Sequence, residues 1–343
     1  MQAAYRPFDV RHTCYTGNSR GLYSSPQQYV MSQFIHGDNV GLCCIRICSR
    51  DDELPVFVTD KITDKTILSS KDNANVFPLW LYEENMGQVE RRANLNPEIV
   101  ARIAAAVTGT TGVSPVGKTG TTGVSPVDAA RTNSSNPTGK MPVVPVNGQD
   151  ARSPGALEIF DYVYAILHTP EYRAKYREFL KTDFPRVPYP KDGEMFRRFA
   201  AIGAQLRTTH LMKDPMPTLA ERTAAFPVAG NNVVEAVRFD LTQRHRDTEI
   251  NESGKNSEPL SLCVKNQCGR VYINDTQYFD NVAQEDFEFF IGGYQPAQKW
   301  LKDRKGRALT RDDLRHYQRI VLALRRTRLL ESELSVLAKG GWN

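Results

Sequence analysis

We expect an α+β fold, with a β-rich, sheet-containing N-terminal part, a helix-rich C-terminal part and a disordered insertion between them. Short β-branched and aromatic runs separated by turn residues occupy residues 1–107, whereas apolar residues recur at helical spacing after residue 155. The chain has 343 residues, of which 40% are hydrophobic and 24% charged, and its net charge is +5. Such values are typical of a soluble globular protein, and they exclude wholesale disorder, a collagen helix and a coiled-coil rod.

In the first part, residues 39–47, 55–59 and 75–82 are predicted to be strands, because they are rich in β-branched and aromatic side chains and are bounded by turn residues. Asn96 and Pro97 then open a helix that ends near Ala106, with proline at the first helical position. Residues 1–107 are therefore expected to be the β-rich part.

Residues 108–154 differ in composition from the rest of the chain. They contain seven Gly, six Pro, five Ser, eight Thr and three Asn, and no Leu, Ile or aromatic residue. The nonapeptide Thr-Gly-Thr-Thr-Gly-Val-Ser-Pro-Val occurs twice, at 108–116 and 119–127. A segment this poor in apolar side chains cannot offset its chain entropy by burial, so we expect a disordered insertion.

Residues 155–343 are predicted to be mainly helical. Apolar side chains at intervals of three and four residues, together with Thr169-Pro170-Glu171, predict helices over 157–167, 169–180 and 194–212. Three short strands are expected at 233–239, 261–264 and 270–274. Two further helices are expected at 284–302 and 310–338.

Several function classes find no support in the sequence. No apolar run approaches the roughly 18 residues that a membrane span requires, and the N-terminus lacks the pattern of a secretion signal, so we expect a cytoplasmic protein. The six cysteines lack zinc-site spacing and are expected to be reduced, and no metal site is predicted. Residues 112–119 match a phosphate-binding loop, but neither a strand before them nor a helix after them can form.

Catalytic motifs are missing as well. The chain lacks the Asn-Pro-Pro-Tyr or Asp-Pro-Pro-Tyr tetrapeptide of amino-methyltransferases, and it lacks the Glu-x-Lys element of restriction nucleases. The hydrolase patterns Gly-x-Ser-x-Gly and His-Glu-x-x-His are also absent. We therefore predict no catalytic residue and no bound cofactor on this chain, and we favour a binding function.

Positive charge is concentrated between residues 299 and 328, which contain eleven lysine and arginine residues but only three acidic residues. Thr310 and Asp313 predict a helix cap, after which Arg311, Arg315 and Arg319 follow at intervals of four and share one helical face. A row of guanidinium groups suits the phosphates of DNA. The alternative is an ordinary solvated helix face.

A second group of arginines lies near the N-terminus, where Arg6, Arg11 and Arg20 alternate with tyrosines. Such an arrangement suits contacts to base edges and to the DNA backbone. In the alternative interpretation, Arg6 or Arg11 pairs with Asp9 in a structural corner.

Several long motifs resemble one known family in the order in which that family carries them. Their sequences are Tyr5-Arg-Pro-Phe-Asp-x-Arg11, Val76-Phe-Pro-Leu-Trp-Leu-Tyr82, Asn94-Leu-Asn-Pro97, Tyr162-Val-Tyr-Ala-Ile-Leu-His-Thr-Pro-Glu-Tyr-Arg173, Asp183-Phe-Pro-Arg-Val-Pro188, Phe226-Pro-Val-Ala-Gly230 and Ile291-Gly-Gly-Tyr-Gln-Pro-Ala-Gln-Lys-Trp-Leu-Lys-Asp-Arg-Lys305. Together they resemble the C-terminal specificity domain of Type ISP restriction-modification enzymes, and they cover nearly all of the chain outside 108–154.

The resemblance implies that the chain recognises a DNA target sequence. In that family one polypeptide carries nuclease, ATPase and adenine-specific methyltransferase modules before this domain. The chain begins four residues before the first motif, so S-adenosylmethionine, ATP and Mg²⁺ are expected only on upstream modules that are absent here. A fragment or a split gene would explain this arrangement, and the insertion at 108–154 has no counterpart in the family pattern.

The leading hypothesis is thus a target-recognition module that binds double-stranded DNA and works with methyltransferase and ATPase modules upstream or in trans. One alternative is a piece of an adenine-specific DNA methyltransferase whose catalytic half lies upstream. Another is a protein–protein interaction remnant of a truncated gene, without DNA binding. The residues expected to contact DNA under the leading hypothesis are Arg6, Arg11, Arg20, Lys299, Lys302, Arg304, Lys305, Arg307, Arg311, Arg315 and Arg319.

Overall fold

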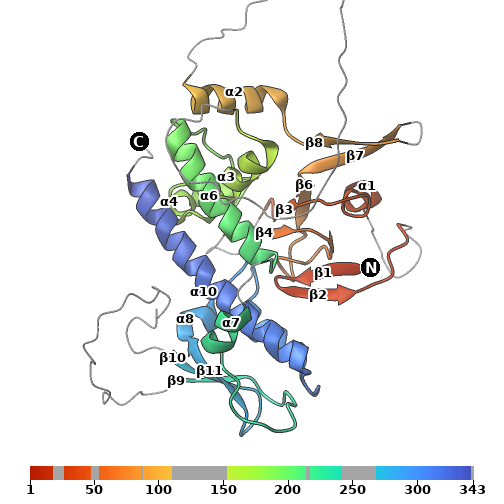
Figure 1. Cartoon of the computed structure of the whole chain (residues 1–343), viewed down its shortest axis with the longest axis vertical. Coiled ribbons are helices and arrows are strands. Elements are labelled where there is room, and N and C mark those ends of the chain that lie inside the picture. The colour runs from red at the N-terminus through yellow and green to blue at the C-terminus, as the bar shows by residue number, and fades with distance from the viewer. Residues whose placement is uncertain are drawn as a thin grey trace, which may run out of the picture.

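The computed structural model describes residues 1–17, 27–47, 54–85, 88–109, 153–213, 217–241 and 268–340 (Figure 1). Most of the insertion predicted at 108–154, the strand predicted at 261–264, the loop at 112–119 and Arg20 therefore lie outside the described residues. The expected α+β class is confirmed.

The N-terminal part consists of short strands and small helices. Its elements are β1 (Gln2–Arg6), β2 (Asp9–His12), α1 (Gln28–Met31), the 3₁₀-helix η1 (Ser32–Phe34), β3 (Gly41–Cys44), β4 (Val56–Thr59), β5 (Ile62–Thr63), β6 (Asn75–Pro78), β7 (Trp80–Asn85), β8 (Gln88–Ala93) and α2 (Pro97–Thr108). Strands β2, β1 and β5 form one sheet and β4, β3 and β6 a second, while β7 and β8 form a separate antiparallel hairpin.

The C-terminal part carries the long helices and one further sheet. Its elements are α3 (Ala156–His168), α4 (Pro170–Lys175), α5 (Arg177–Leu180), α6 (Gly193–His210), α7 (Pro217–Thr223), β9 (Arg238–Leu241), β10 (Cys268–Tyr272), β11 (Tyr278–Ala283), α8 (Gln284–Glu288), α9 (Pro296–Lys302) and α10 (Arg311–Lys339). Strands β11, β10 and β9 are antiparallel neighbours. Helix α10 crosses the whole molecule diagonally (Figure 1).

Two hydrophobic cores lie along α10, and each draws residues from both parts of the chain. One core combines strand residues such as Val56 with the helices α3 and α6 and with the C-terminal end of α10. The other combines Phe8 and Phe57 with the β9–β11 sheet, α9 and the N-terminal half of α10. The β-rich and helix-rich parts are thus interleaved, since neither core is complete within one of them.

Four predicted elements differ from the observed ones. The helix predicted at 169–180 divides into α4 and α5 at Tyr176, which has a φ of −105° and a ψ of 13°. The helix predicted at 284–302 is interrupted between α8 and α9, where Gly292 adopts a φ of 59° and a Cβ at that position would lie 2.4 Å from the carbonyl oxygen of Leu68. The strand predicted at 75–82 divides at Leu79 into β6 and β7, which belong to different sheets. Of residues 233–239, only Arg238 and Phe239 join β9, and Val233 forms an isolated bridge to Ala308.

The cysteines partly differ from expectation. Cys14, Cys43 and Cys44 are free, and burial raises the pKa of Cys44 to about 12 and that of Cys43 further, so both behave as core residues. Cys268, in contrast, is disulfide-bonded, so the expectation that the cysteines are reduced is wrong for this residue. Within the described ranges, no group of three or more His, Cys, Asp and Glu side chains is placed to hold a metal ion. No helix there is long and apolar enough to cross a membrane.

Candidate nucleic-acid interface

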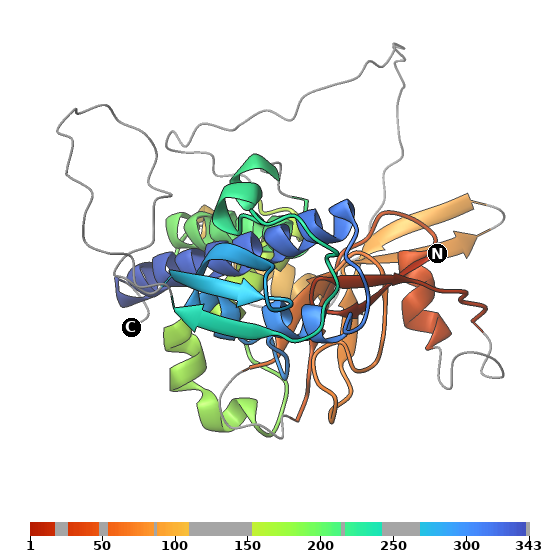
Figure 2. The same cartoon turned by 90° about the horizontal axis from the view of Figure 1, so that it is seen from below.

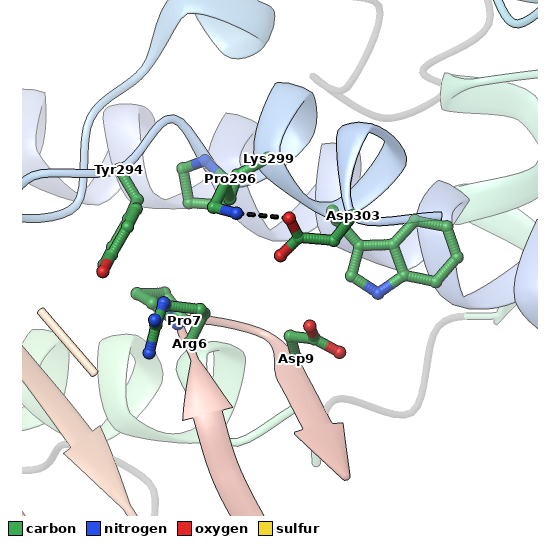
Figure 3. Close-up of a pocket in the computed structure, with 8 residues that line it drawn as sticks. Arg6, Pro7, Asp9, Tyr294, Pro296, Lys299 and Asp303 are labelled. Carbon is green, nitrogen blue, oxygen red and sulfur yellow. Dashed lines mark hydrogen bonds and ion pairs between the residues drawn. The ribbon is translucent and has the colours of Figure 1, made fainter. Parts of the chain in front are cut away.

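The structure brings the two predicted groups of cations together, although they are almost 300 residues apart in the sequence. Hairpin β1–β2, which carries Arg6 and Arg11, packs against α9 and the turn after it, which carry Lys299 and Arg304. A pocket lies between them (Figure 3). The residues that line it are Arg6, Pro7, Asp9, Tyr294, Pro296, Lys299, Trp300 and Asp303.

The hairpin is held in place by its unusual turn. Phe8 adopts a left-handed conformation with φ 63°, which is uncommon for a large side chain and places its ring in the core. The ring contacts Phe57 and His210 edge-on, at centroid distances of 5.3 and 5.9 Å. Nε2 of His316, on α10, lies 2.7 Å from the Phe8 carbonyl oxygen and donates to it. The turn thereby fixes the hairpin against the first half of α10.

Asp9 lies at the centre of the ion pairs that connect the β1–β2 hairpin with α9 and the turn after it. We call this contact the joint. Its carboxylate is buried, with Nη2 of Arg304 at 3.0 Å from one oxygen and Nη2 of Arg11 at 2.9 Å from the other. The guanidinium of Arg304 also stacks on the ring of Trp300 at 3.6 Å. Asp303 adds a second carboxylate, which accepts from Lys299 and lies 3.5 Å from Arg11. The cations of the joint are therefore largely neutralised within the fold.

Arg6 has a different set of partners. Its guanidinium lies 3.4 Å from Asp64, donates to the Tyr5 carbonyl at 2.6 Å, and stacks against the rings of Tyr5 and Tyr294. Its side chain is 12% exposed. The structural-corner alternative thus holds for Arg11, which does pair with Asp9, whereas Arg6 pairs with Asp64. Since Arg6 and Arg304 are mostly covered and paired, removing either leaves a carboxylate short of a partner.

Further along the chain, cations reach the surface. The end of α9, the turn after it and the first turns of α10 carry five exposed cationic side chains, which we call the cationic turn: Lys302, Lys305, Arg307, Arg311 and Arg315. The capping box predicted for α10 is present, with Thr310 Oγ1 accepting from the Asp313 amide at 3.1 Å and Asp313 accepting from Thr310. This cap sets the direction in which α10 leaves the turn.

The same cap engages the carboxylate of Asp313, one of the acidic groups of the region. Partial burial acts to raise the pKa of Asp313, but the hydrogen bonds from Thr310 and the nearby Arg304 and Arg307 outweigh it, so the pKa lies below its usual value. Asp313 is therefore ionised and hydrogen-bonded at the helix start, where the helix dipole favours negative charge.

The predicted row of three arginines on α10 divides in the structure. Arg311 and Arg315 are exposed, whereas Arg319 is half-buried and donates to the carbonyl oxygen of Met212. Further along, Arg325 and Arg328 pair with the buried Asp286 of α8 at 2.9 and 2.6 Å. The charge excess of residues 299–328 thus serves two purposes. Arg325 and Arg328 hold α8 against α10, and the side chains of the cationic turn are exposed to solvent.

The β7–β8 hairpin carries further polar side chains at the surface and was not predicted from the sequence. Glu83 and Arg92 lie on adjacent strands and are paired at 2.8 Å, and Glu90 is exposed beside them. The available signal was the run of charged residues at 90–92. Because residues 75–82 were predicted to be one strand, the start of β7 at Trp80 was missed.

Comparisons with known proteins identify the family. The fold combines small sheets with one long helix, α10, which packs on several of the other helices. Residues 1–331 match the model of the Type ISP C-terminal specificity domain, and the chain therefore belongs to this family. A search of curated protein sequences found no match.

Three solved structures share the fold. One is the ATP-dependent Type ISP restriction-modification enzyme LlaBIII bound to DNA, with 14% identity, a TM-score of 0.56, and coverage of 97% of this chain and 18% of that one. A nuclease-deletion mutant of the Type ISP enzyme LlaGI in complex with a DNA substrate mimic gives 15% identity, a TM-score of 0.52, and coverage of 97% and 24%. A DrdV–DNA complex gives 18% identity, a TM-score of 0.54, and coverage of 99% and 28%. This chain thus spans between 18% and 28% of the lengths of these proteins.

Proposed function

We propose that this chain is a DNA target-recognition module, which binds double-stranded DNA and carries the sequence specificity of a restriction-modification system. The match of residues 1–331 to the specificity-domain family carries the proposal. The three similar structures are of proteins in complex with DNA or a DNA mimic, which supports the same assignment. A module of this kind works where the cell keeps its DNA, in the cytoplasm.

The cationic turn is the part of the structure best suited to hold the DNA backbone. Its five side chains are exposed, and the neighbouring Asp313 is occupied by the helix cap. Lysine and arginine side chains that neutralise phosphates release condensed counterions, which is the main source of sequence-independent affinity. Arg6 and Arg304, in contrast, are proposed to support this surface from within the joint, because their charges are already paired.

We also propose that the remaining activities reside on other modules. The structurally similar proteins are much longer than this chain, and their descriptions name an ATP-dependent restriction-modification enzyme and a nuclease. S-adenosylmethionine, ATP and Mg²⁺ would then bind to methyltransferase and ATPase modules that join this one in cis or in trans. On this proposal the purified chain binds DNA without modifying it.

The salt dependence of DNA binding tests the phosphate-contact proposal. We would measure the affinity of the chain for a fluorescent duplex by anisotropy over a series of salt concentrations. In the variant with Lys305→Gln, Arg307→Gln and Arg311→Gln, three exposed charges are lost while helix propensity is kept. We expect weaker binding and a slope of log affinity against log salt that is reduced by up to roughly three units.

A control variant removes three exposed charges elsewhere: Arg102→Gln on α2, Lys191→Gln just before α6 and Arg198→Gln on α6. Helix α2 and the first part of α6 lie toward the C-terminal end of α10, away from the cationic turn at its start (Figure 1). The control should bind like the unmodified chain. Equal slopes for all three proteins would contradict the phosphate role of the cationic turn, and an unmodified chain that does not bind DNA would favour the protein–protein interaction alternative.

A further inference from the structure

The β7–β8 hairpin projects from the body of the molecule as a two-stranded ribbon. Figures 1 and 2 both show it extending away from the other sheets on the N-terminal side. The pairing is antiparallel and runs from Trp80 opposite Ala93 to Asn85 opposite Gln88. An isolated two-stranded ribbon is marginally stable by itself, so its persistence requires support at the base.

Side-chain amides from the neighbouring segment supply that support. Asn39 accepts from the Trp80 amide at 3.0 Å and donates to the Trp80 carbonyl at 2.8 Å. Oε1 of Gln33 accepts from the Tyr82 amide at 2.6 Å. Both amide side chains are buried. The edge of β7 is thereby held as if by a third strand as far as Tyr82, and the ribbon beyond it is free to project.

One face of the ribbon carries polar side chains. Residues directly opposite each other in an antiparallel pair share a face, which places Glu83 with Glu90 and, two positions along, Leu81 with Arg92. Leu81 is buried at the base, while Glu83, Glu90 and Arg92 are exposed. We call these three residues the ribbon face. Two glutamates directly opposite each other are unfavourable in a sheet, and the ion pair with Arg92 offsets this for Glu83.

The chemistry of the ribbon face matches that of base edges. The major groove of B-DNA admits a two-stranded β-ribbon, and arginine donates two hydrogen bonds to guanine there while glutamate accepts from the amino group of cytosine. Nε and Nη2 of Arg92 lie 2.8 Å from the carboxylate of Glu83. This contact fixes the plane of the guanidinium and leaves Nη1 and part of Nη2 available to a partner.

We propose that the β7–β8 ribbon enters the major groove and reads bases, with Arg92 oriented by Glu83 toward a guanine and Glu90 facing a cytosine amino group. The proposal rests on the DNA-binding function proposed above and adds to it the residues that determine specificity. The cationic turn would supply affinity, and the ribbon face would supply base preference.

Selection from a random duplex pool tests the assignment with the full chain. Bound duplexes are recovered and sequenced for the unmodified protein and for Arg92→Gln and Glu90→Gln. We expect Arg92→Gln to lower the preference for guanine at one position of the recovered motif by roughly tenfold. Glu90→Gln should change the preference at a different position in the same motif.

Arg91→Gln is the matched control, because Arg91 neighbours Arg92 but lies opposite Tyr82 on the other face, where it stacks on Trp80 at 4.4 Å. It loses the same charge from the same ribbon. The control should recover the unmodified motif. Thermal unfolding of each variant shows whether the ribbon substitutions leave the fold intact, as their exposure predicts.

The outcomes separate this inference from the proposed function. If the unmodified chain recovers a motif and both ribbon-face variants recover the same one, the ribbon does not read bases, although the chain still recognises DNA. If the ribbon-face variants keep the motif but no longer bind a methyltransferase module, the ribbon contacts a protein partner instead of bases. An unmodified chain that binds no DNA would overturn both proposals.

Discussion

At the scale of single residues, His210 shows how a buried polar group is held neutral in this fold. The hydroxyl of Thr327 donates to the Ala323 carbonyl at 2.8 Å, so it accepts from Nε2 of His210, which lies 2.8 Å away. The hydroxyl of Tyr164 donates to Nδ1 at 2.5 Å. Both ring nitrogens are thus occupied by the neutral form. Sequence reasoning could not find this network, because its members are 46 and 117 positions apart from His210.

Stability should fall with acidification because of such histidines. Burial lowers the pKa of His210 well below its usual value, and it also lowers the pKa of His168 and of His316, with Arg173 adding to the effect at the first two. An unfolded histidine binds its proton near pH 6.5, so below that pH the unfolded state takes up more protons than the folded state. The stabilisation is complete above about pH 6.5 and is lost as the pH falls toward the folded-state pKa, by up to about 1.4 kcal/mol per pH unit for each histidine.

Urea unfolding at about pH 7.5 and about pH 5.5 measures this loss. The variant His210→Gln should be less stable at neutral pH but should show a flatter pH dependence, since one titrating group is gone. His36→Gln is the control, because His36 is exposed. A pH dependence equally steep in His210→Gln and in the unmodified chain would contradict the assignment.

At the scale of elements, local signals predicted most helices but not their contacts. Asn96 and Pro97 mark the start of α2, and Thr310 with Asp313 marks the start of α10, because caps are encoded within a few residues. The break between α8 and α9 has a local signal in Gly292-Gly293 and Pro296, but the close approach of Gly292 to Leu68 was not predictable, because Leu68 is distant in the chain. Hairpin β1–β2 was missed because its turn uses Phe8, a residue that rarely adopts positive φ.

The packing of α3 on α6 gives a prediction in which two effects have opposite signs. A Cβ at Gly203 would lie 1.9 Å from the carbonyl oxygen of Asp161 on α3. Alanine gains about 1 kcal/mol in helix propensity, but this overlap with backbone forces the two helices apart. We expect Gly203→Ala to destabilise the chain by about 2 kcal/mol or more, measured by urea unfolding.

Ala201→Gly, on the exposed side of the same helix, is the control for propensity alone. It should cost about 1 kcal/mol without altering packing. A Gly203→Ala variant that is more stable than the unmodified chain would show that α3 and α6 can separate at little cost.

At the scale of the whole molecule, the sequence indicated the composition of each part but not their interleaving. The division at 108–154 follows from composition, and the two flanking segments were expected to be parts of one specificity domain. Ala4, Phe8 and Ile45 nevertheless share a core with Val271 and residues of α10. These contacts join residues more than 200 positions apart, which no local pattern encodes. The candidate site has the same origin, because Asp9 and Arg304 meet only in the folded chain.

Interleaved cores predict that the two segments fold only together. Residues 1–109 alone would expose Phe8, Ile45 and Phe57. Residues 153–343 alone would expose the surfaces of α3 and α10 that share a core with residues 1–109. Each segment separately should therefore lack cooperative thermal unfolding. When the two are co-expressed without the segment between them, they should assemble into a one-to-one complex, because the buried contacts do not require a covalent connection. Size-exclusion chromatography and circular dichroism would check this, and cooperative unfolding of residues 1–109 by themselves would instead show that they form an independent domain.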